Sequence, residues 1–167
     1  MDRVAVVTIV ALLSGSFEDA FAQRRQSEAP AESAAIIVAA RIGGKDYQGS
    51  GTGSCRHEPE ASIRGVSAAL WTVQYAGQKG AVKQLNLTLW RPTDGSPDQL
   101  SLSLVTGSGS HRIETGAKEG DRGEGSVTIL PSGPGGRLEI SGKEAGGKAV
   151  QVTIDCPAFA GVEAEGG

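Results

Sequence analysis

Histidine, methionine and aromatic residues are scarce in this chain. Its 167 residues include two His and one Met, and only 4% of them are aromatic. Two histidines exclude a three-histidine zinc site, although sites that mix His with other ligands stay open. A basic excess is also missing, because the net charge is −3, and this argues against nucleic acid as a partner. We therefore expect no nucleic-acid partner, no metal and no other cofactor.

Glycine, in contrast, is abundant, with 25 Gly beside 7 Pro. These residues follow no Gly-X-Y period, which excludes a collagen-like fibre. The length fits one domain. The hydropathy of the chain is near neutral, which is typical of a folded protein rather than of a wholly disordered one.

The N-terminal residues 1–22 have the layout of a secretory signal peptide. Arg3 supplies a positive start, residues 4–17 are mostly apolar, and Ala-Phe-Ala at 20–22 matches the small-x-small pattern before a cleavage site. A membrane anchor is the alternative, but the apolar run is shorter than the roughly 20 residues that span a bilayer. No Cys ends the run, so no lipid attachment is expected there. We predict a periplasmic or extracellular protein, cleaved near Ala22, without stable membrane insertion.

The cysteines of the chain are Cys55 and Cys156, and both remain after this cleavage. An even count in an exported chain predicts a disulfide. A pair of reactive thiols is the alternative, but the chain has no Cys-x-x-Cys motif. Closing a loop of about 100 residues contributes up to about 4.7 kcal/mol in the chain-entropy model. The bridge would tie an early strand to the last one.

A period of two residues runs through most of the chain. Apolar residues alternate with other residues in the segments 69–75, 85–90, 100–105, 127–129, 138–140 and 150–155. Such alternation is typical of antiparallel strands with one apolar and one wet face. A strand from Ile36 would start the domain, with a short helix over 32–41 as the alternative. Residues 23–35 are expected to form a flexible stem and residues 161–167 a disordered tail.

Turn sequences separate these segments. Residues 92–97 carry Pro, Asp and Gly, and Gly-rich stretches follow other segments. We predict an antiparallel β-sandwich of about seven to nine short strands over residues 36–160. A closed barrel is the alternative, and the sandwich is preferred because the disulfide would then staple two sheets. The predicted core consists of Leu85, Leu87, Leu89, Leu100, Leu102, Leu104, Val127, Ile129, Leu138, Ile140, Val150, Val152 and Ile154.

Few residues suggest catalysis. His57 and His111 are each interpreted as solvated strand ends, because the spacing of their neighbours matches no metal site. The chain has no Gly-x-Ser-x-Gly elbow, and the Gly-rich stretch 51–54 lacks the Lys of a phosphate loop. The acids Glu119 and Asp121 lie in a polar, Gly-rich loop and are expected to be solvated. We therefore predict no catalytic residue.

Trp90 and Arg91 are the candidate ligand contacts. Trp90 points away from the leucines of segment 85–89, so it faces water or a second layer if those leucines form the core. An exposed Trp beside an Arg would be able to stack on a sugar ring or on the surface of a partner. The alternative is that Trp90 ends its strand and packs under the turn that follows. Trp71 and Tyr75 are more simply explained as core residues.

Three segments carry a resemblance to the mycobacterial lipoprotein-antigen family. They are Ile-Gly-Gly-Lys at 42–45, Gly-Arg-Leu-Glu-Ile-Ser-Gly at 136–142 and Val-Thr-Ile-Asp-Cys at 152–156, and the Gly-rich approach to Cys55 adds to them. The resemblance spans about residues 41–156. It implies a small exported β-domain of the envelope or the medium, without known catalysis, and it carries over no catalytic residue. This chain lacks the family's lipid-acceptor Cys, which argues against a lipid anchor here.

These features together predict an exported, non-enzymatic binding or structural protein of the bacterial envelope. Its partner would be an envelope protein or a glycan, recognised by polar loops on a rigid scaffold. Two alternatives stay open, because fold class does not decide function. One is a secreted hydrolase whose site is assembled only in three dimensions. The other is an envelope inhibitor or interaction protein with an apolar patch around Trp90.

Overall fold

Nine antiparallel β-strands make up the part of the chain that the structure describes, and this part contains no helix. The computed structural model describes residues 35–63, 65–116 and 123–161, which belong to one compact unit, Ser33–Gly167. The predicted all-β class is confirmed, and the alternative of a helix reaching residue 41 is wrong. The strands are β1 (Ile36–Ile42), β2 (Lys45–Ile63), β3 (Val66–Gly80), β4 (Val82–Pro92), β5 (Gln99–Thr106), β6 (Gly109–Glu114), β7 (Glu124–Ser132), β8 (Gly135–Lys143) and β9 (Ala149–Cys156).

Some predictions concern residues outside the described ranges. They are the signal peptide over 1–22, the stem up to residue 34, the acids Glu119 and Asp121, and the tail from residue 162 onward. These stay predictions.

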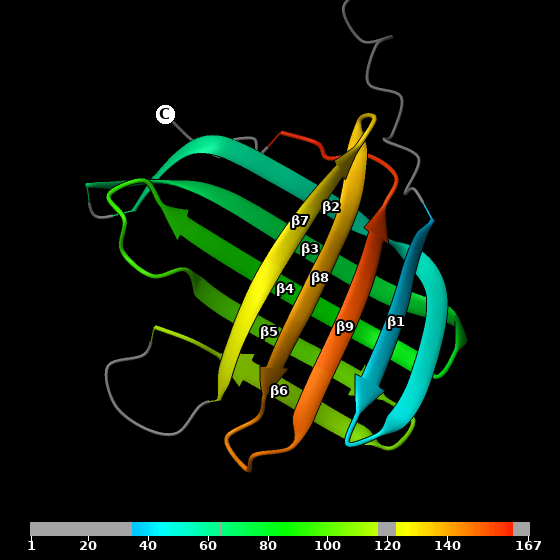
Figure 1. The fold of residues 1–167 in the computed structure, drawn as a ribbon. Helices are drawn as coiled ribbons and strands as arrows, with labels where there is room; N and C mark the ends of the chain where they lie inside the picture. Colours follow the sequence, from blue (N-terminus) through cyan, green and yellow to red (C-terminus); the bar gives the residue numbers. More distant parts are fainter. Residues whose placement is uncertain (1–34, 64, 117–122, 162–167) are drawn as a thin grey trace, which may run out of the picture. The chain divides into compact units, whose positions relative to one another are not determined.

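The strands of the described residues form one continuous sheet, in the order β6-β5-β4-β3-β2-β1-β9-β8-β7. The sheet curls into a half-barrel, and Figure 1 shows β1, β9, β8 and β7 crossing in front of the layer formed by β3 to β6. The predicted sandwich of two separate sheets is therefore wrong, because β1 pairs with β2 on one side and with β9 on the other. One alternating sequence serves a sandwich and a curled sheet equally well, so the pattern did not distinguish them.

The long strand β2 carries the sheet from one layer to the other. It has 19 residues, more than the short strands predicted, and it pairs with both β1 and β3. Its pairing with β3 shifts register between Ser50 and Gly51 and again between Glu58 and Ala61, and such bulges bend a strand. A side chain at Gly51 would collide with the carbonyl oxygen of Ala76, so glycine is required where β3 comes this close. The bend of β2 is visible at the side of the half-barrel in Figure 1.

The hydrophobic core lies on the inner face of the curled sheet. Every predicted core residue is buried except Ile129, which is partly buried against the others. Tyr75 is buried in this core and Trp71 packs against it, as predicted. β1 adds Ile36, Val38 and Ile42 to the core. Alternating positions thus supply one apolar inner face, and the other positions form the outer face.

The predicted disulfide between Cys55 and Cys156 is confirmed, with Cα atoms 6.0 Å apart. It joins β2 to β9 within one sheet, rather than two sheets, next to the N-terminal end of β1. Beyond that end, the chain that follows β9 lies alongside β2. The N–H of Ala160 donates to the Cys55 carbonyl at 3.0 Å, and the N–H of His57 donates to the Ala160 carbonyl at 2.9 Å. The disulfide therefore joins β9 directly to β2 at the point where β1 no longer lies between them.

The edge strands β6 and β7 meet through side chains. The described residues form no backbone ladder between them. Ile113 of β6 packs so close to Gly125 of β7 that an added Cβ there would lie 3.1 Å from its Cγ2 atom. Two polar contacts link parts of the sheet that are distant in the strand order, one of them through the turn between β5 and β6. Arg91 Nη2 donates to the Val127 carbonyl at 3.1 Å, and the hydroxyls of Tyr47 and Ser108 are 2.8 Å apart.

Candidate ligand-binding groove

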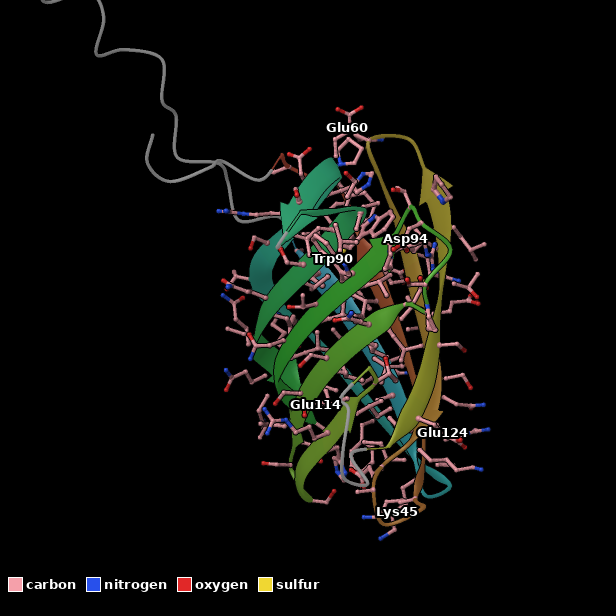
Figure 2. All side chains as sticks on the ribbon, turned by 90° about the vertical axis from the view of Figure 1, so that its left-hand side faces the viewer. Lys45, Glu60, Trp90, Asp94, Glu114 and Glu124 are labelled. Atoms are coloured by element: carbon pink, nitrogen blue, oxygen red, sulfur yellow. A yellow bond between two sulfur atoms is a disulfide. The ribbon has the colours of Figure 1, made fainter. Side chains whose placement is uncertain are left out.

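A groove of about 680 Å³ lies mainly on the outer face of β3, β4 and β5. Its lining combines an apolar floor with a polar rim. The lining residues are Val66, Leu70, Thr88, Trp90, Pro92, Asp94, Ser96, Gln99, Leu100, Ser101, Glu114, Thr115 and Gly116. In Figure 2, Trp90 and Asp94 lie toward the end of the half-barrel that carries Glu60, and Lys45 marks the opposite end.

The apolar floor is a small cluster outside the main core. Trp90 and Ala68 are buried, yet neither belongs to the core cluster on the inner face. In the register of β3 and β4, Leu70 pairs with Trp90 and Ala68 with Pro92, so these apolar residues occupy adjacent positions on the outer face. Val66, which is 38% exposed, brings apolar surface to the mouth of the groove.

Trp90 faces away from the core leucines, as the alternation predicted, but its side chain is not exposed. Only 6% of Trp90 is accessible, and the next outward residue on its strand, Pro92, is also buried. Of the two interpretations of Trp90, the structure therefore supports packing beside the Pro92 turn and not an exposed ring. The reason is the cross-strand cluster with Ala68 and Leu70, which joins residues of two strands. Trp90 forms part of the groove floor.

The rim of the groove carries two carboxylates. The Ser96 N–H donates to Asp94 Oδ1 at 2.9 Å and holds the pKa of that carboxyl below its usual value, so Asp94 is ionised at neutral pH. Glu114 Oε1 lies 3.1 Å from Arg112 Nε. Thr115 fixes one end of the groove, because its hydroxyl accepts the Leu100 N–H at 2.8 Å. Both carboxylates are acceptors for ligand hydroxyls or ammonium groups.

Arg91 lies on the inner face, opposite Trp90, and does not line the groove. Its guanidinium donates to both carboxylate oxygens of Asp98 at 2.8–3.1 Å, and these hydrogen bonds raise the pKa of Arg91. It also lies 5.6 Å from the centre of the Trp71 ring. Together with the hydrogen bond to the Val127 carbonyl, these contacts give the Arg91 guanidinium its partners within the protein. Adjacent residues of a strand point to opposite faces, and this separates the two candidate ligand contacts.

His57 is partly buried in an aromatic stack, not solvated at a strand end. Its ring lies 4.3 Å from that of Trp71, at an angle of 8° between the planes. The Phe159 ring packs edge-on against it at 6.3 Å. The stack joins β2, β3 and the segment after β9. Phe159 had no sequence signal for this role, because it follows the last alternating segment.

His111 is also not solvated, since it is only 8% exposed on the inner face of β6. Its Nδ1 lies 2.8 Å from Glu144 Oε1, and its Nε2 is buried without a partner among the described residues. Lys148 Nζ lies 3.7 Å from the other oxygen of Glu144. The contact joins β6 to the turn between β8 and β9, which are far apart in the sheet order, and so no local pattern predicted it. Neither His111 nor Glu144 lines the groove.

The two histidines do not share a site. The strand pairing places His57 level with Leu100 of β5, whereas His111 pairs with Leu104 of the same strand. The two histidines are therefore separated by three strands across the sheet and by four residues along it. No group of three or more His, Cys, Asp or Glu residues in the described part of the chain is arranged to hold a metal ion.

No family model, curated protein or solved structure matches this chain. The resemblance to the lipoprotein-antigen family therefore stays a proposal. Within residues 35–63, 65–116 and 123–161, no helix has the length and apolar character needed to cross a bilayer.

Proposed function

We propose that the chain is an exported, non-enzymatic binding protein of the bacterial envelope, and that the Trp90 groove binds a saccharide. The observation that carries the proposal is the combination of an apolar floor with a hydroxyl, amide and carboxylate rim. Saccharides offer apolar C–H surfaces together with many hydroxyls, and sites for such ligands combine apolar surface with a few placed polar groups. Val66, Leu70 and Trp90 match the C–H surfaces, and Thr88, Gln99 and Ser101 match the hydroxyls.

Export is supported by two independent features. The disulfide of Cys55 and Cys156 is compatible with an oxidising compartment such as the periplasm or the medium. The charge, apolar run and small-x-small pattern of residues 1–22 are those of a signal peptide. The resemblance to an envelope family supports the same location.

Glycan-array binding of the purified, oxidised protein tests the proposal. Thr88→Val and Gln99→Ala each remove one hydrogen-bonding group of the rim, and we expect each to weaken binding about fivefold, as for the loss of about 1 kcal/mol. Thr128→Val and Gln151→Ala are matched controls, because both residues are exposed on the outer face of β7 and β9. Equal losses in rim and control variants, or no binding to any glycan, would overturn the proposal.

A secreted glycoside hydrolase is the second candidate, because Asp94 and Glu114 line the same groove and such enzymes use two carboxylates. The lowered pKa of Asp94 argues against its acting as the general acid. Measurement of reducing ends released from bound glycans separates the candidates. Release that is lost in Glu114→Gln would establish the hydrolase, and binding without release supports the binding protein.

A further inference from the structure

A second hollow lies on the same outer face as the Trp90 groove. It has about 500 Å³ and is lined by Thr52, Gly53, Ser54, Gln74, Tyr75, Ala76, Lys83, Gln84 and Asn86. Asn86 and Thr88 are alternate residues of β4, so both side chains point to the outer face. Thr88 lines the groove and Asn86 lines the second hollow, which makes the two sites neighbours along one strand.

The combined length of the two sites exceeds that of a single sugar ring. Lys83 and Pro92 mark their far ends on β4. A strand rises about 3.4 Å per residue, so the distance along β4 is about 30 Å. This length fits several sugar rings in a row.

Where the two sites adjoin, the outer face carries uncharged hydrogen-bonding groups. The sheet register aligns them in two cross-strand rows, Thr72–Thr88–Ser101 and Gln74–Asn86–Ser103. Strands lie about 4.8 Å apart, which sets the spacing within each row. None of these six side chains hydrogen-bonds to another described residue, so their donors and acceptors are open to a ligand.

The charged side chains that line the two sites each have a partner in the protein. Asp94 accepts the Ser96 N–H, Glu114 pairs with Arg112, and Lys83 Nζ donates to the Gly80 carbonyl at 2.9 Å. A cation that lacks a partner would favour phosphate, sulfate or carboxylate groups on the ligand. The lining of both sites therefore favours an uncharged polymer over an acidic one.

We infer that the ligand is an extended, uncharged polysaccharide that lies along β4 and occupies both the Trp90 groove and the hollow at Asn86. The inference rests on the proposed saccharide-binding function and adds the length and charge of the ligand to it. The Trp90 groove holds one end of the segment. The side chains of Asn86 and Gln74 bind sugar units farther along the chain.

Titration calorimetry with cellulose, chitin, α-glucan and mannan fragments of increasing length tests the inference. Affinity is expected to rise with fragment length until the fragment spans both sites. Asn86→Ala and Gln74→Ala are expected to weaken binding of the long fragment about fivefold each and to leave binding of the short one unchanged. The control is Gln151→Ala on the outer face of β9, and the thermal midpoint of each variant verifies that it is folded.

The outcomes separate the inference from the proposed function. If long and short fragments bind equally well, or if Asn86→Ala and Gln74→Ala bind like wild type while Thr88→Val is weakened, the extended site is refuted and the groove survives. If an acidic polysaccharide binds more tightly than all four uncharged polymers, the assigned charge is wrong. If no fragment binds at any length, both the inference and the proposed function fail.

Discussion

The two outer faces of the curled sheet differ in how they use charge. The face of β1, β9, β8 and β7 carries the ion pairs Arg41–Asp46, Arg137–Asp155 and Lys143–Glu124, each between residues that are directly opposite in the register. The face of β3, β4 and β5 instead carries uncharged rows and the Trp90 groove. Both faces are formed by the outward-facing positions of alternating strands. Exposure to solvent therefore does not explain why one face carries ion pairs and the other carries uncharged rows.

The two faces differ in whether their polar side chains have partners within the protein. Exposed ion pairs contribute at most about 1 kcal/mol each, but opposite charges in facing positions favour the correct register. On the face of β1, β9, β8 and β7, the charged side chains are thus paired with one another. On the face of β3, β4 and β5, the six side chains of the two uncharged rows have no hydrogen-bond partner among the described residues, and the Trp90 side chain is buried on the same face.

The largest effect is expected where the two layers are tied together. Replacing both cysteines, as Cys55→Ser with Cys156→Ser, removes the bridge between β2 and β9 and should lower the free energy of unfolding by about 4 kcal/mol. Urea denaturation of the variant against the oxidised protein measures this. Reduction of the wild type provides the control, and an unchanged midpoint in both would show that the bridge does not stabilise the fold.

Replacing a large apolar residue on each outer face tests the comparison directly. Trp90→Ala should cost about 3 kcal/mol, because the side chain is 6% exposed and its removal leaves a cavity. Leu130→Ala, at a residue that is 46% exposed on the charged face, should cost less than about 1 kcal/mol. Equal costs in urea denaturation would contradict the assignment of a second, smaller apolar cluster to the outer face of β3 and β4.

Arginines on the inner and outer faces should also differ. Arg91→Met removes three hydrogen bonds to Asp98, the bond to the Val127 carbonyl and the contact with Trp71, so we expect a loss of about 2 kcal/mol. Arg137→Met breaks an exposed pair with Asp155 and should cost less than about 1 kcal/mol. Thermal unfolding of the two variants ranks them, and the reverse ranking would contradict the role of Arg91 in joining β4 to β7.

The smallest effect is expected from pH. The folded-state pKa of Asp94 is depressed by the Ser96 N–H, so the interaction is fully present above the unfolded pKa of about 3.9 and is lost as pH falls through the folded value. Affinity of the groove for an uncharged glycan should therefore stay constant from about pH 7 to about pH 5. Binding measured across this range tests the expectation, with Asp94→Asn as the control. A steep change in wild type that is absent in this variant would show that Asp94 titrates there.

Alternation predicted β3, β4, β5, β7, β8 and β9 and the core residues that they supply, because apolar residues repeat at every second position of their inner faces. It did not predict β2 or β6, because glycines occupy alternate positions of β2 and His111 shares the inner face of β6. The two cysteines predicted the bridge. The curvature was not predictable, because it depends on bulges in β2 and on how closely β3 approaches Gly51. The burial of Trp90 and the pair of His111 with Glu144 depend on residues of other strands, and no short-range pattern encodes such contacts. The groove likewise combines residues from four strands.

The position of β1 has a consequence for how the chain folds. The first and last strands are neighbours in the sheet, so the run from β1 to β6 and the hairpin of β7 and β8 can form locally but cannot join until β9 is available. Contacts between such distant segments slow folding, since the loop between them must close first. A chain that stops before residue 149 would leave β1 and β8 as unpaired apolar edges, which promote aggregation. Formation of the Cys55–Cys156 disulfide is thus expected only after β9 has paired between β1 and β8.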